Sequence, residues 1–196
     1  MPKPLWYFLS TEAKIAFAVL FSIYWISETI ISRCMRAGSQ DHNEDRGSLR
    51  LLAILMPLSW LIAPALVVVP QTSFGNPTVF IAGLALMIAG QLLRWWSIAT
   101  LGGLFTVNVA IRAGHRLIES GPYRFVRHPA YTAILLFHLG TALCLGNVLS
   151  LIVLTVPVTA GLLNRMRVEE DVLASGLGQT YREYMNRTKR LIPGLY

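Results

Sequence analysis

Residues 51–69, LLAILMPLSWLIAPALVVV, form an apolar run of nineteen positions without a charged side chain. At about 1.5 Å per residue, a helix of this length crosses a hydrocarbon core of about 30 Å. The run contains Pro57 and Pro64, and membrane helices tolerate proline more readily than helices of soluble cores do. The run therefore predicts a transmembrane helix.

The rest of the chain repeats this pattern. Of the 196 residues, 54% are hydrophobic and only 14% are charged, whereas soluble domains average about 25% charged residues. Residues 13–32 and 78–100 are two further long apolar runs, with Glu28 inside the first and Arg94 inside the second. The apolar excess argues against a disordered chain, and two cysteines are too few for a disulfide scaffold. We expect a polytopic integral membrane protein.

Residues 129–163 are too long for one span and short for two. Their only acidic or basic side chain is His138, whereas one span needs about 20 residues and two need about 40. Gly146 and Asn147 form a turn dipeptide near the middle, which predicts a tight hairpin of two short helices. The expected fold is all-α with five transmembrane helices, three of them within residues 1–100.

The basic residues indicate the orientation of these spans. Fourteen of the seventeen lysines and arginines lie between spans one and two, between spans three and four, or after span five. Lys3 and Lys14 lie on the opposite side, and Arg94 lies within a span. The positive-inside rule makes the basic side cytosolic. We therefore expect an outside N-terminus and a cytosolic C-terminus, so the net charge of +7 does not indicate nucleic-acid binding.

Two polar regions of some length fall on the predicted cytosolic face, residues 101–128 and 164–196. In the first, residues 105–111 alternate like a strand, but with no evident partner strand we expect irregular backbone. In the second, five residues at helical spacing form an apolar stripe, and we expect Gly176 and Gly178 to break it into two pieces. Arg165 and Glu169 lie four residues apart and share a helix face. The stripe consists of Met166, Leu173, Leu177, Tyr181 and Tyr184.

Common catalytic signatures are missing from these regions. The sequence has no dinucleotide-binding or phosphate-binding glycine motif, no zinc-protease motif, no metal-ligand spacing and no nucleophile elbow. Without these motifs, any nucleotide-like cofactor would bind outside a Rossmann fold, and no metal is expected.

The acidic trio Glu169–Asp171 lies at the foot of the last span. It would repel lipid phosphates and attract a cation.

The second half of the chain resembles the isoprenylcysteine carboxyl methyltransferases and their relatives, the phospholipid N-methyltransferases. The resemblance rests on GHRLIESGPYRFVRHPAY at 114–131, RMRVEEDVL at 165–173, YREY at 181–184 and the closing Ile192-Pro193. It covers roughly residues 101–196, which would be the catalytic region and would include the hairpin. The short chain suggests a small prokaryotic-type member.

This resemblance implies S-adenosyl-L-methionine as methyl donor, with S-adenosyl-L-homocysteine as product. It places Arg165 at the substrate. It implies the following cofactor-binding residues: Asn108, His115, Arg116, Leu117, Ile118, Tyr123, His128, Pro129, Ala130, Tyr131 and Glu169.

The residue chemistry favours one acceptor among those the resemblance allows. A prenylated cysteine, or another lipid-borne carboxylate, is already anionic at neutral pH and needs a cationic partner such as Arg165. A phospholipid amine needs a base, for which Glu170, Asp171 or a histidine are the options, and Arg165 would repel it. We therefore expect carboxyl O-methylation, with phospholipid N-methylation second. A nicotinamide-dependent lipid reductase and a non-enzymatic membrane scaffold are further alternatives. The membrane would be the plasma membrane of a prokaryote or the endoplasmic reticulum of a eukaryote.

Overall fold

The computed structural model describes residues 9–196 except 36–41, 44–46, 75, 108–109 and 112–115. The described residues are almost entirely helical. The helices are α1 (Thr11–Cys34), α2 (Ser48–Ala65), α3 (Pro77–Leu101), α4 (Pro129–Leu145), α5 (Val148–Leu177) and α6 (Gln179–Arg187). Short 3-10 turns are η2 (Leu66–Val68), η3 (Pro70–Thr72), η4 (Gly102–Leu104) and η5 (Gly121–Arg124), and the two-residue strands are β1 (His42–Asn43) and β2 (Ala110–Ile111).

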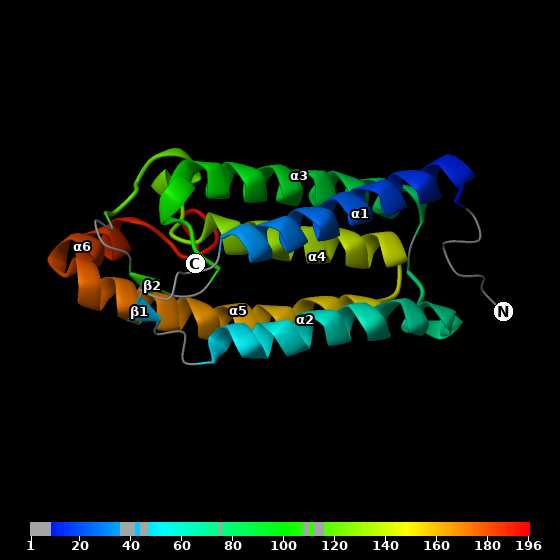
Figure 1. Ribbon diagram of the computed structural model, residues 1–196. Helices are drawn as coiled ribbons and strands as arrows, with labels where there is room; N and C mark the ends of the chain where they lie inside the picture. The colour runs from blue at the N-terminus through cyan, green and yellow to red at the C-terminus, as the bar shows by residue number, and fades with distance from the viewer. Residues whose placement is uncertain (1–8, 36–41, 44–46, 75, 108–109, 112–115) are drawn as a thin grey trace.

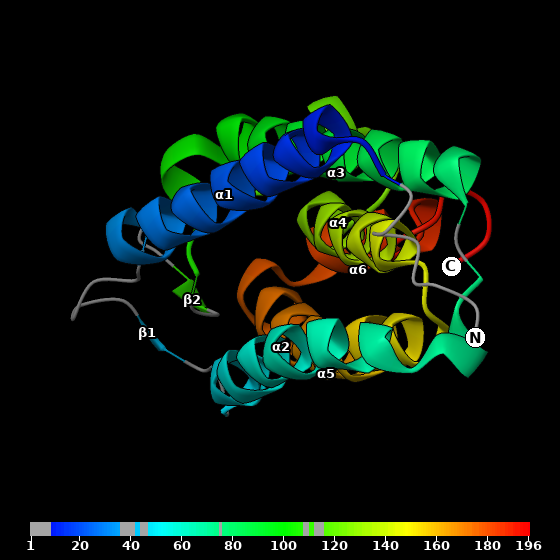
Figure 2. The ribbon, with the colours of Figure 1, turned by 90° about the vertical axis from the view of Figure 1, so that its right-hand side faces the viewer.

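The five long helices run side by side along one axis (Figure 1). Viewed along that axis, α1 and α3 lie on one side, α2 and α5 on the other, and α4 between the two pairs (Figure 2). Eleven of the seventeen residues of α4 are buried, against only Tyr24 and Ile31 in α1. Helix α4 is thus the centre of the bundle, and α1 is a peripheral helix.

Four helical segments are long and apolar enough to cross a membrane: 11–34, 48–68, 77–104 and 148–177. This agrees with the spans predicted at 13–32, 51–69 and 78–100. Helix α4 is apolar but has only 17 residues. Helix α5 has 30 residues and is about 45 Å long, so it exceeds a hydrocarbon core of about 30 Å. Its first charged residue is Arg165, so its apolar part ends there.

The turn between α4 and α5 falls at Gly146–Asn147, the dipeptide that the sequence singled out. Gly146 adopts a positive φ of 63° after the last residue of α4. The Asn147 side chain caps α5, because its Oδ1 accepts from the amides of Leu149 and Ser150 at 3.0 and 3.2 Å. Its Nδ2 donates to the carbonyls of Leu66 and Val69. One buried side chain thus joins this turn to the end of α2.

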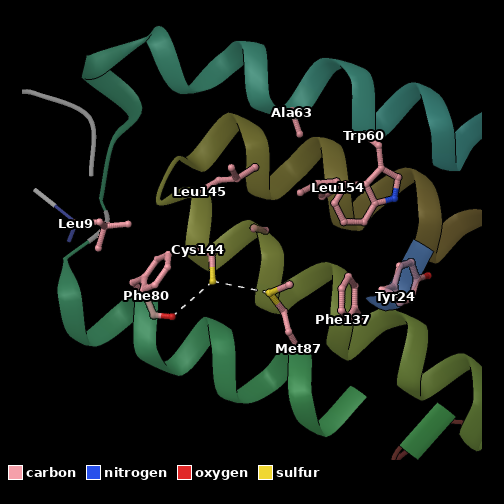
Figure 3. Packing of buried hydrophobic residues seen from close by; sticks show 11 residues of the cluster. Leu9, Tyr24, Trp60, Ala63, Phe80, Met87, Phe137, Cys144, Leu145 and Leu154 are labelled. Carbon is pink, nitrogen blue, oxygen red and sulfur yellow. Dashed lines mark hydrogen bonds between the residues drawn. The ribbon is translucent and has the colours of Figure 1, made fainter. Parts of the chain in front are cut away.

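Glycines bring α3 and α4 into close contact. A Cβ atom on Gly83 would lie 2.6 Å from the carbonyl oxygen of Gly140, and one on Gly90 would lie 2.8 Å from that of Ala133. Small residues let helix backbones approach closely where lipid supplies no hydrophobic driving force. The next layer of the core is aromatic and aliphatic, with Phe80, Met87 and Cys144 between α3 and α4, and Trp60 beside Tyr24 and Phe137 (Figure 3).

Two details differ from the sequence-based expectations. The alternating stretch after α3 does have a partner, because Ala110–Ile111 pairs antiparallel with His42–Asn43 from the loop between α1 and α2. Of the two glycines expected to break the C-terminal stripe, only Gly178 does so, because α5 continues through Gly176 and ends before Gly178, whose φ is 61°. A helix can pass a glycine at modest cost, whereas a left-handed residue ends it.

Candidate active site

A cavity lies where the ends of α3, α4 and α5 meet α6 and the η5 turn. It contains about 1030 Å³ of empty space, part of it open to solvent. Polar groups from α3, α4 and α5 project into it, including Arg94, Tyr131, Arg165 and Glu169. Its other walls are apolar or aromatic: Leu101, Leu104, Phe105, Leu117, Ile118, Tyr123, Val172, Leu173, Leu177, Tyr181 and Tyr184.

The start of α4 is held at this cavity by Glu170. The buried carboxylate of Glu170 accepts from Arg127 Nε at 2.9 Å, from Arg190 Nη2 at 2.6 Å and from His128 Nε2 at 3.1 Å. Burial opposes the charged carboxylate, but hydrogen bonds from His128, Arg190 and Arg127 outweigh it and hold the pKa of Glu170 below its ordinary value. Glu170 therefore stays ionised, and it fixes the His128 ring with Nε2 as the donor.

The C-terminal segment reinforces the same junction. The amides of Arg127 and His128 donate to the carbonyls of Lys189 and Arg190 at 2.8 and 3.0 Å. In α6, the Tyr184 hydroxyl donates to the Tyr123 carbonyl at 2.6 Å. These hydrogen bonds thus join residues 123–128 to residues 184–190, two segments that are far apart in the sequence, beside the cavity.

The hydroxyl of Tyr131 connects two oppositely charged side chains of α5. It donates to Glu169 Oε2 at 2.5 Å and accepts from Arg165 Nε at 3.0 Å. The Arg165 guanidinium also donates to Ser48 Oγ at 3.1 Å and to the Val107 carbonyl. Arg165 is therefore only 4% exposed, and its orientation is fixed from three sides.

A second, apolar cavity adjoins the first between α1, α2, α4 and α5. It contains about 880 Å³ of empty space, and its walls include Trp25, Leu52, Met56, Ile134 and Leu162. Four residues line both cavities: Arg94, Val107, Tyr131 and Arg165. A polar cavity and an apolar one thus meet at two arginines and a tyrosine hydroxyl.

Arg94 reaches this junction from α3 and is paired with Glu28 of α1. Nε and Nη2 of Arg94 donate to the two carboxylate oxygens of Glu28 at 2.8 and 3.0 Å. From sequence, Arg94 and Glu28 are charged residues within two different spans, and the structure pairs them with each other. Such groups inside a membrane are expensive unless paired. The pair brings a cation to the wall of both cavities.

Most of the sequence-predicted site residues that the structure describes come together at the first cavity. Arg116, Leu117, Ile118, Tyr123, His128, Ala130, Tyr131, Arg165 and Glu169 all line it. Pro129 does not, because it is fully buried at the first turn of α4. Asn108 and His115 lie outside the described residues.

Burial keeps the tyrosines around the cavity protonated. Desolvation, with Glu169 nearby, raises the pKa of Tyr123 and of Tyr181 well above the ordinary value. Desolvation also raises the pKa of Tyr184 to about 12. Their rings and hydroxyl groups are therefore neutral at physiological pH.

Sequence reasoning missed part of the cavity. The Leu173, Leu177, Tyr181 and Tyr184 stripe was interpreted as an amphipathic face, and in the structure it forms one wall. The helical spacing of these four residues indicated a stripe, but it did not indicate that the stripe lines a cavity. The Glu170 contacts with Arg127 and Arg190 had no signal in sequence spacing, since they join residues 43 and 20 positions apart.

A family model described as the isoprenylcysteine carboxyl methyltransferase (ICMT) family matches residues 83–175, which run from α3 through most of α5. The matched segment is similar to the members of that family. It contains most of the polar residues that meet at the two cavities, including Arg94, Tyr131, Arg165 and Glu169.

Individual relatives agree with the family match. Protein-S-isoprenylcysteine O-methyltransferase B of Arabidopsis thaliana is 35% identical over 113 residues, which is 57% of each chain. The Schizosaccharomyces pombe protein-S-isoprenylcysteine O-methyltransferase is 27% identical over 173 residues, covering 87% of this chain and 66% of the relative. The present chain thus spans little more than half the length of several ICMT relatives that it matches.

A solved structure gives the same result for the fold. The eukaryotic intramembrane Ras methyltransferase ICMT matches with a TM-score of 0.58 and 28% identity, over 72% of this chain and 52% of that one. The ICMT-like fold and the membrane-length helices make this chain an integral membrane protein.

Proposed function

We propose that this chain transfers a methyl group from S-adenosyl-L-methionine to the C-terminal carboxylate of a prenylated cysteine. The observation that supports this most is the meeting of a polar cavity and an apolar cavity at Arg94, Tyr131 and Arg165. A two-part substrate, with an isoprenoid tail and a carboxylate, matches this arrangement. The names of the relatives, protein-S-isoprenylcysteine O-methyltransferases, support the same substrate.

The side chains of the first cavity suit this methyl donor, which carries a sulfonium, an amino-acid group and an adenosine. Glu169 can pair with its ammonium or with its ribose hydroxyls. The rings of Tyr123, Tyr131 and Tyr181 can face the cation or the adenine. We propose Asn108, His115–Ile118, His128, Pro129 and Ala130 as further contributors.

The second cavity suits the isoprenoid tail. Its walls are apolar, and it lies between the peripheral helix α1 and helix α2. A lipid chain inside it would place its polar end at the junction, where Arg165 presents a guanidinium. Guanidinium binds carboxylate through two parallel hydrogen bonds. The existing contacts of Arg165 with Tyr131, Ser48 and Val107 orient it in advance.

The reaction needs little acid–base catalysis from the chain. When bound, S-adenosyl-L-methionine supplies the methyl group, which bonds to a carboxylate oxygen as its bond to sulfur breaks and sulfur keeps the electron pair. The acceptor is already anionic at neutral pH, so no residue must remove a proton. Arg165 and Arg94 hold the carboxylate in line, and the apolar walls exclude water.

The same geometry disfavours phospholipid N-methylation. A phospholipid amine is protonated at neutral pH and would be repelled by two arginines at the junction. Glu170, one of the possible bases, already accepts hydrogen bonds from two arginines and His128. A nicotinamide-dependent reductase and a scaffold remain outcomes of the test below.

We further propose that α4 is a fifth, short span and forms a hairpin with α5. Its burial at the centre of the bundle lets it be shorter than a lipid-facing helix. Following the positive-inside rule, the first cavity and the C-terminus face the cytosol and the N-terminus lies outside. In this arrangement residues 1–100 supply three spans and residues 101–196 the catalytic region.

Thermal unfolding of the detergent-purified protein separates the candidate functions. Methyl transfer predicts stabilisation by S-adenosyl-L-homocysteine and not by NADPH, because a ligand stabilises only a protein that binds it. Methyl incorporation into farnesylcysteine, with phosphatidylethanolamine as the competing acceptor, then identifies the substrate. Stabilisation by NADPH alone would favour a reductase, and stabilisation by neither would favour a scaffold. Both results would overturn the proposal.

A further inference from the structure

Four large apolar side chains are exposed at the cavity end of the molecule, outside the five long helices. Phe125 follows the η5 turn and is 56% exposed, and segment 191–196 exposes Ile192, Leu195 and Tyr196 at 49%, 75% and 43%. Single exposed apolar side chains are common, whereas a group of them marks a surface that contacts lipid or another protein. We call these four residues the apolar patch.

Backbone pairing brings the two parts of the patch together. Residues 126–128 run beside residues 189–190, because two amides of the first stretch donate to two carbonyls of the second at 2.8 and 3.0 Å. Phe125 and segment 191–196 therefore flank the same short stretch of paired backbone. The patch is thus one local feature, although its residues are far apart in the sequence.

Segment 191–196 is a closed turn with a fixed backbone. The amides of Leu191 and Ile192 both donate to the Tyr196 carbonyl, at 2.7 and 2.8 Å, and the Leu195 amide donates to the Ile192 carbonyl at 3.1 Å. Arg190 Nη1 donates to the Tyr196 hydroxyl at 3.1 Å. These hydrogen bonds hold the turn in a conformation that keeps Ile192 and Leu195 exposed.

The patch lies at the level where the helices leave the membrane. Thr132, in the first turn of α4, donates from Oγ1 to the Leu191 carbonyl at 2.9 Å. A Cβ atom on Gly121 of η5 would lie 3.3 Å from Nε1 of Trp96, which is exposed near the end of α3. Tryptophan is enriched at membrane–water interfaces. Segment 191–196 also lies at the outer edge of the bundle, level with the start of α4 (Figures 1 and 2).

The charges around the patch suit a phospholipid surface. Arg124 and Lys189 are exposed beside it, and neither residues 120–128 nor residues 186–196 contain an aspartate or a glutamate. Segments that lie in a membrane interface combine apolar side chains with lysine and arginine. Lipid already surrounds the exposed apolar faces of the neighbouring helices of this membrane protein. A leaflet would therefore cover the patch without a further partner.

We propose that the apolar patch lies in the phospholipid leaflet at the cavity end of the molecule, with Arg124 and Lys189 at the level of the phosphates. The leaflet then anchors the segment next to Arg190, whose Nη2 donates to Glu170 at 2.6 Å. The membrane in this way supports the junction that holds the start of α4 at the first cavity. This inference goes beyond the proposed function, because it involves neither the methyl donor nor the acceptor.

Nitroxide labels on single cysteines measure where the patch lies. Leu195→Cys and Phe125→Cys carry the label on the patch, and Gln179→Cys, at the exposed start of α6, is the matched control. The background is Cys34→Ser, because Cys34 is exposed whereas Cys144 is buried. In vesicles of phosphatidylcholine and phosphatidylglycerol, each label is tested for collisions with oxygen, which concentrates in lipid, and with a water-soluble nickel chelate.

The oxygen-to-nickel collision ratio should be at least about threefold higher at positions 195 and 125 than at position 179, because interfacial side chains lie about 5–10 Å into the headgroup boundary. Both patch positions are exposed, so their cysteine variants should keep the wild-type melting temperature.

Two results would overturn the proposal. Ratios at 195 and 125 equal to the ratio at 179 would place the patch in water. Slow collisions with both reagents would show that a protein partner or a second copy of this chain covers it. None of these measurements involves methyl transfer, so this inference and the proposed function can fail separately.

Discussion

At the scale of single residues, the site depends on charged groups that are held before any ligand arrives. Tyr131 lies between Arg165 and Glu169 and hydrogen-bonds to both. Each charge therefore keeps one orientation in a place where water is scarce and electrostatic interactions are strong. Two predictions separate the role of the cation from that of the anion.

Arg165→Lys should reduce methylation of farnesylcysteine about tenfold, which corresponds to about 1.4 kcal/mol, because a point charge lacks the two-pronged geometry of guanidinium. Affinity for S-adenosyl-L-homocysteine should stay within about threefold. Arg165→Ala should lose more activity and some cofactor affinity as well, because Arg165 also holds Tyr131 and the Val107 carbonyl. Methyl incorporation and isothermal titration measure the two effects. Full activity in the lysine variant would remove Arg165 from the substrate site.

Glu169→Gln should weaken S-adenosyl-L-homocysteine binding by about tenfold, since a hydrogen bond to a charged group contributes about 1.5–3 kcal/mol. The matched control is Asp171→Asn, which removes one negative charge from an exposed position two residues away. Isothermal titration of both variants distinguishes the loss of a specific contact with the cofactor from the loss of one negative charge near the cavity. Equal affinities in the two variants would contradict the assignment of Glu169.

At the scale of elements, the contact between α3 and α4 positions the start of α4 and therefore Tyr131. Gly90→Ala should lower the melting temperature, because the new Cβ would lie 2.8 Å from the Ala133 carbonyl oxygen and 2.9 Å from the Phe137 amide nitrogen. Overpacking of this kind costs about 1–3 kcal/mol, more than the gain of about 1 kcal/mol in helix propensity. Gly103→Ala, where a Cβ meets nothing within 4 Å, is the control. Equal melting temperatures for Gly90→Ala and Gly103→Ala in detergent would mean that α3 and α4 can move apart without a loss of stability.

The Glu170 contacts join α5, the start of α4 and the C-terminal segment, and they predict a pH dependence. Because hydrogen bonds hold the folded-state pKa of Glu170 below its ordinary value of 4.5, its stabilising contribution is fully present above that value. The contribution is lost as the pH falls through the lower folded-state pKa. Glu170→Gln should therefore cost about 3 kcal/mol at neutral pH, and the difference in melting temperature from wild type should shrink below pH 4.5. A difference that does not change with pH would show that the lost contacts are not electrostatic.

At the scale of the whole molecule, α1 is held both by aromatic side chains that pack against the core and by polar contacts within a span. Only Tyr24 and Ile31 of α1 are buried, while Glu28 pairs with Arg94 and Ser27 accepts from Trp95 at 2.7 Å. Helix α1 also forms one wall of the apolar cavity at the junction. The buried ion pair therefore couples the outer helix to the junction.

Glu28→Gln should lower stability by about 3 kcal/mol, because it leaves Arg94 buried without its anion. Methylation of a lipid substrate should fall more than affinity for S-adenosyl-L-homocysteine, since α1 lines the lipid cavity and not the first one. Glu12→Gln, at the exposed start of the same helix, is the control. Parallel loss of cofactor affinity and methylation would contradict this division. Melting curves, titration and methyl incorporation supply the three measurements.

Sequence alone determined the apolar spans and part of the lining of the first cavity. Runs such as 51–69 are long enough to cross a bilayer, and hydrocarbon leaves a backbone of this length few alternatives to a helix. The turn at Gly146–Asn147 was predictable for a similar local reason, because a positive φ and a capping side chain are properties of those two residues. Motifs at 114–131 and 165–173 carried the resemblance to a family, and through it nine of the residues that line the first cavity.

Tertiary structure decided what depends on distance in sequence. The pairing of Glu28 with Arg94, the three partners of Glu170 and the strand pair at residues 42 and 111 join positions that no local pattern relates. The apolar cavity depends on how α1, α2, α4 and α5 pack together, since side chains from all four helices line it. A hydrophobic pattern specifies that a helix lies in lipid, whereas side-chain packing between helices determines where it leaves space for a substrate.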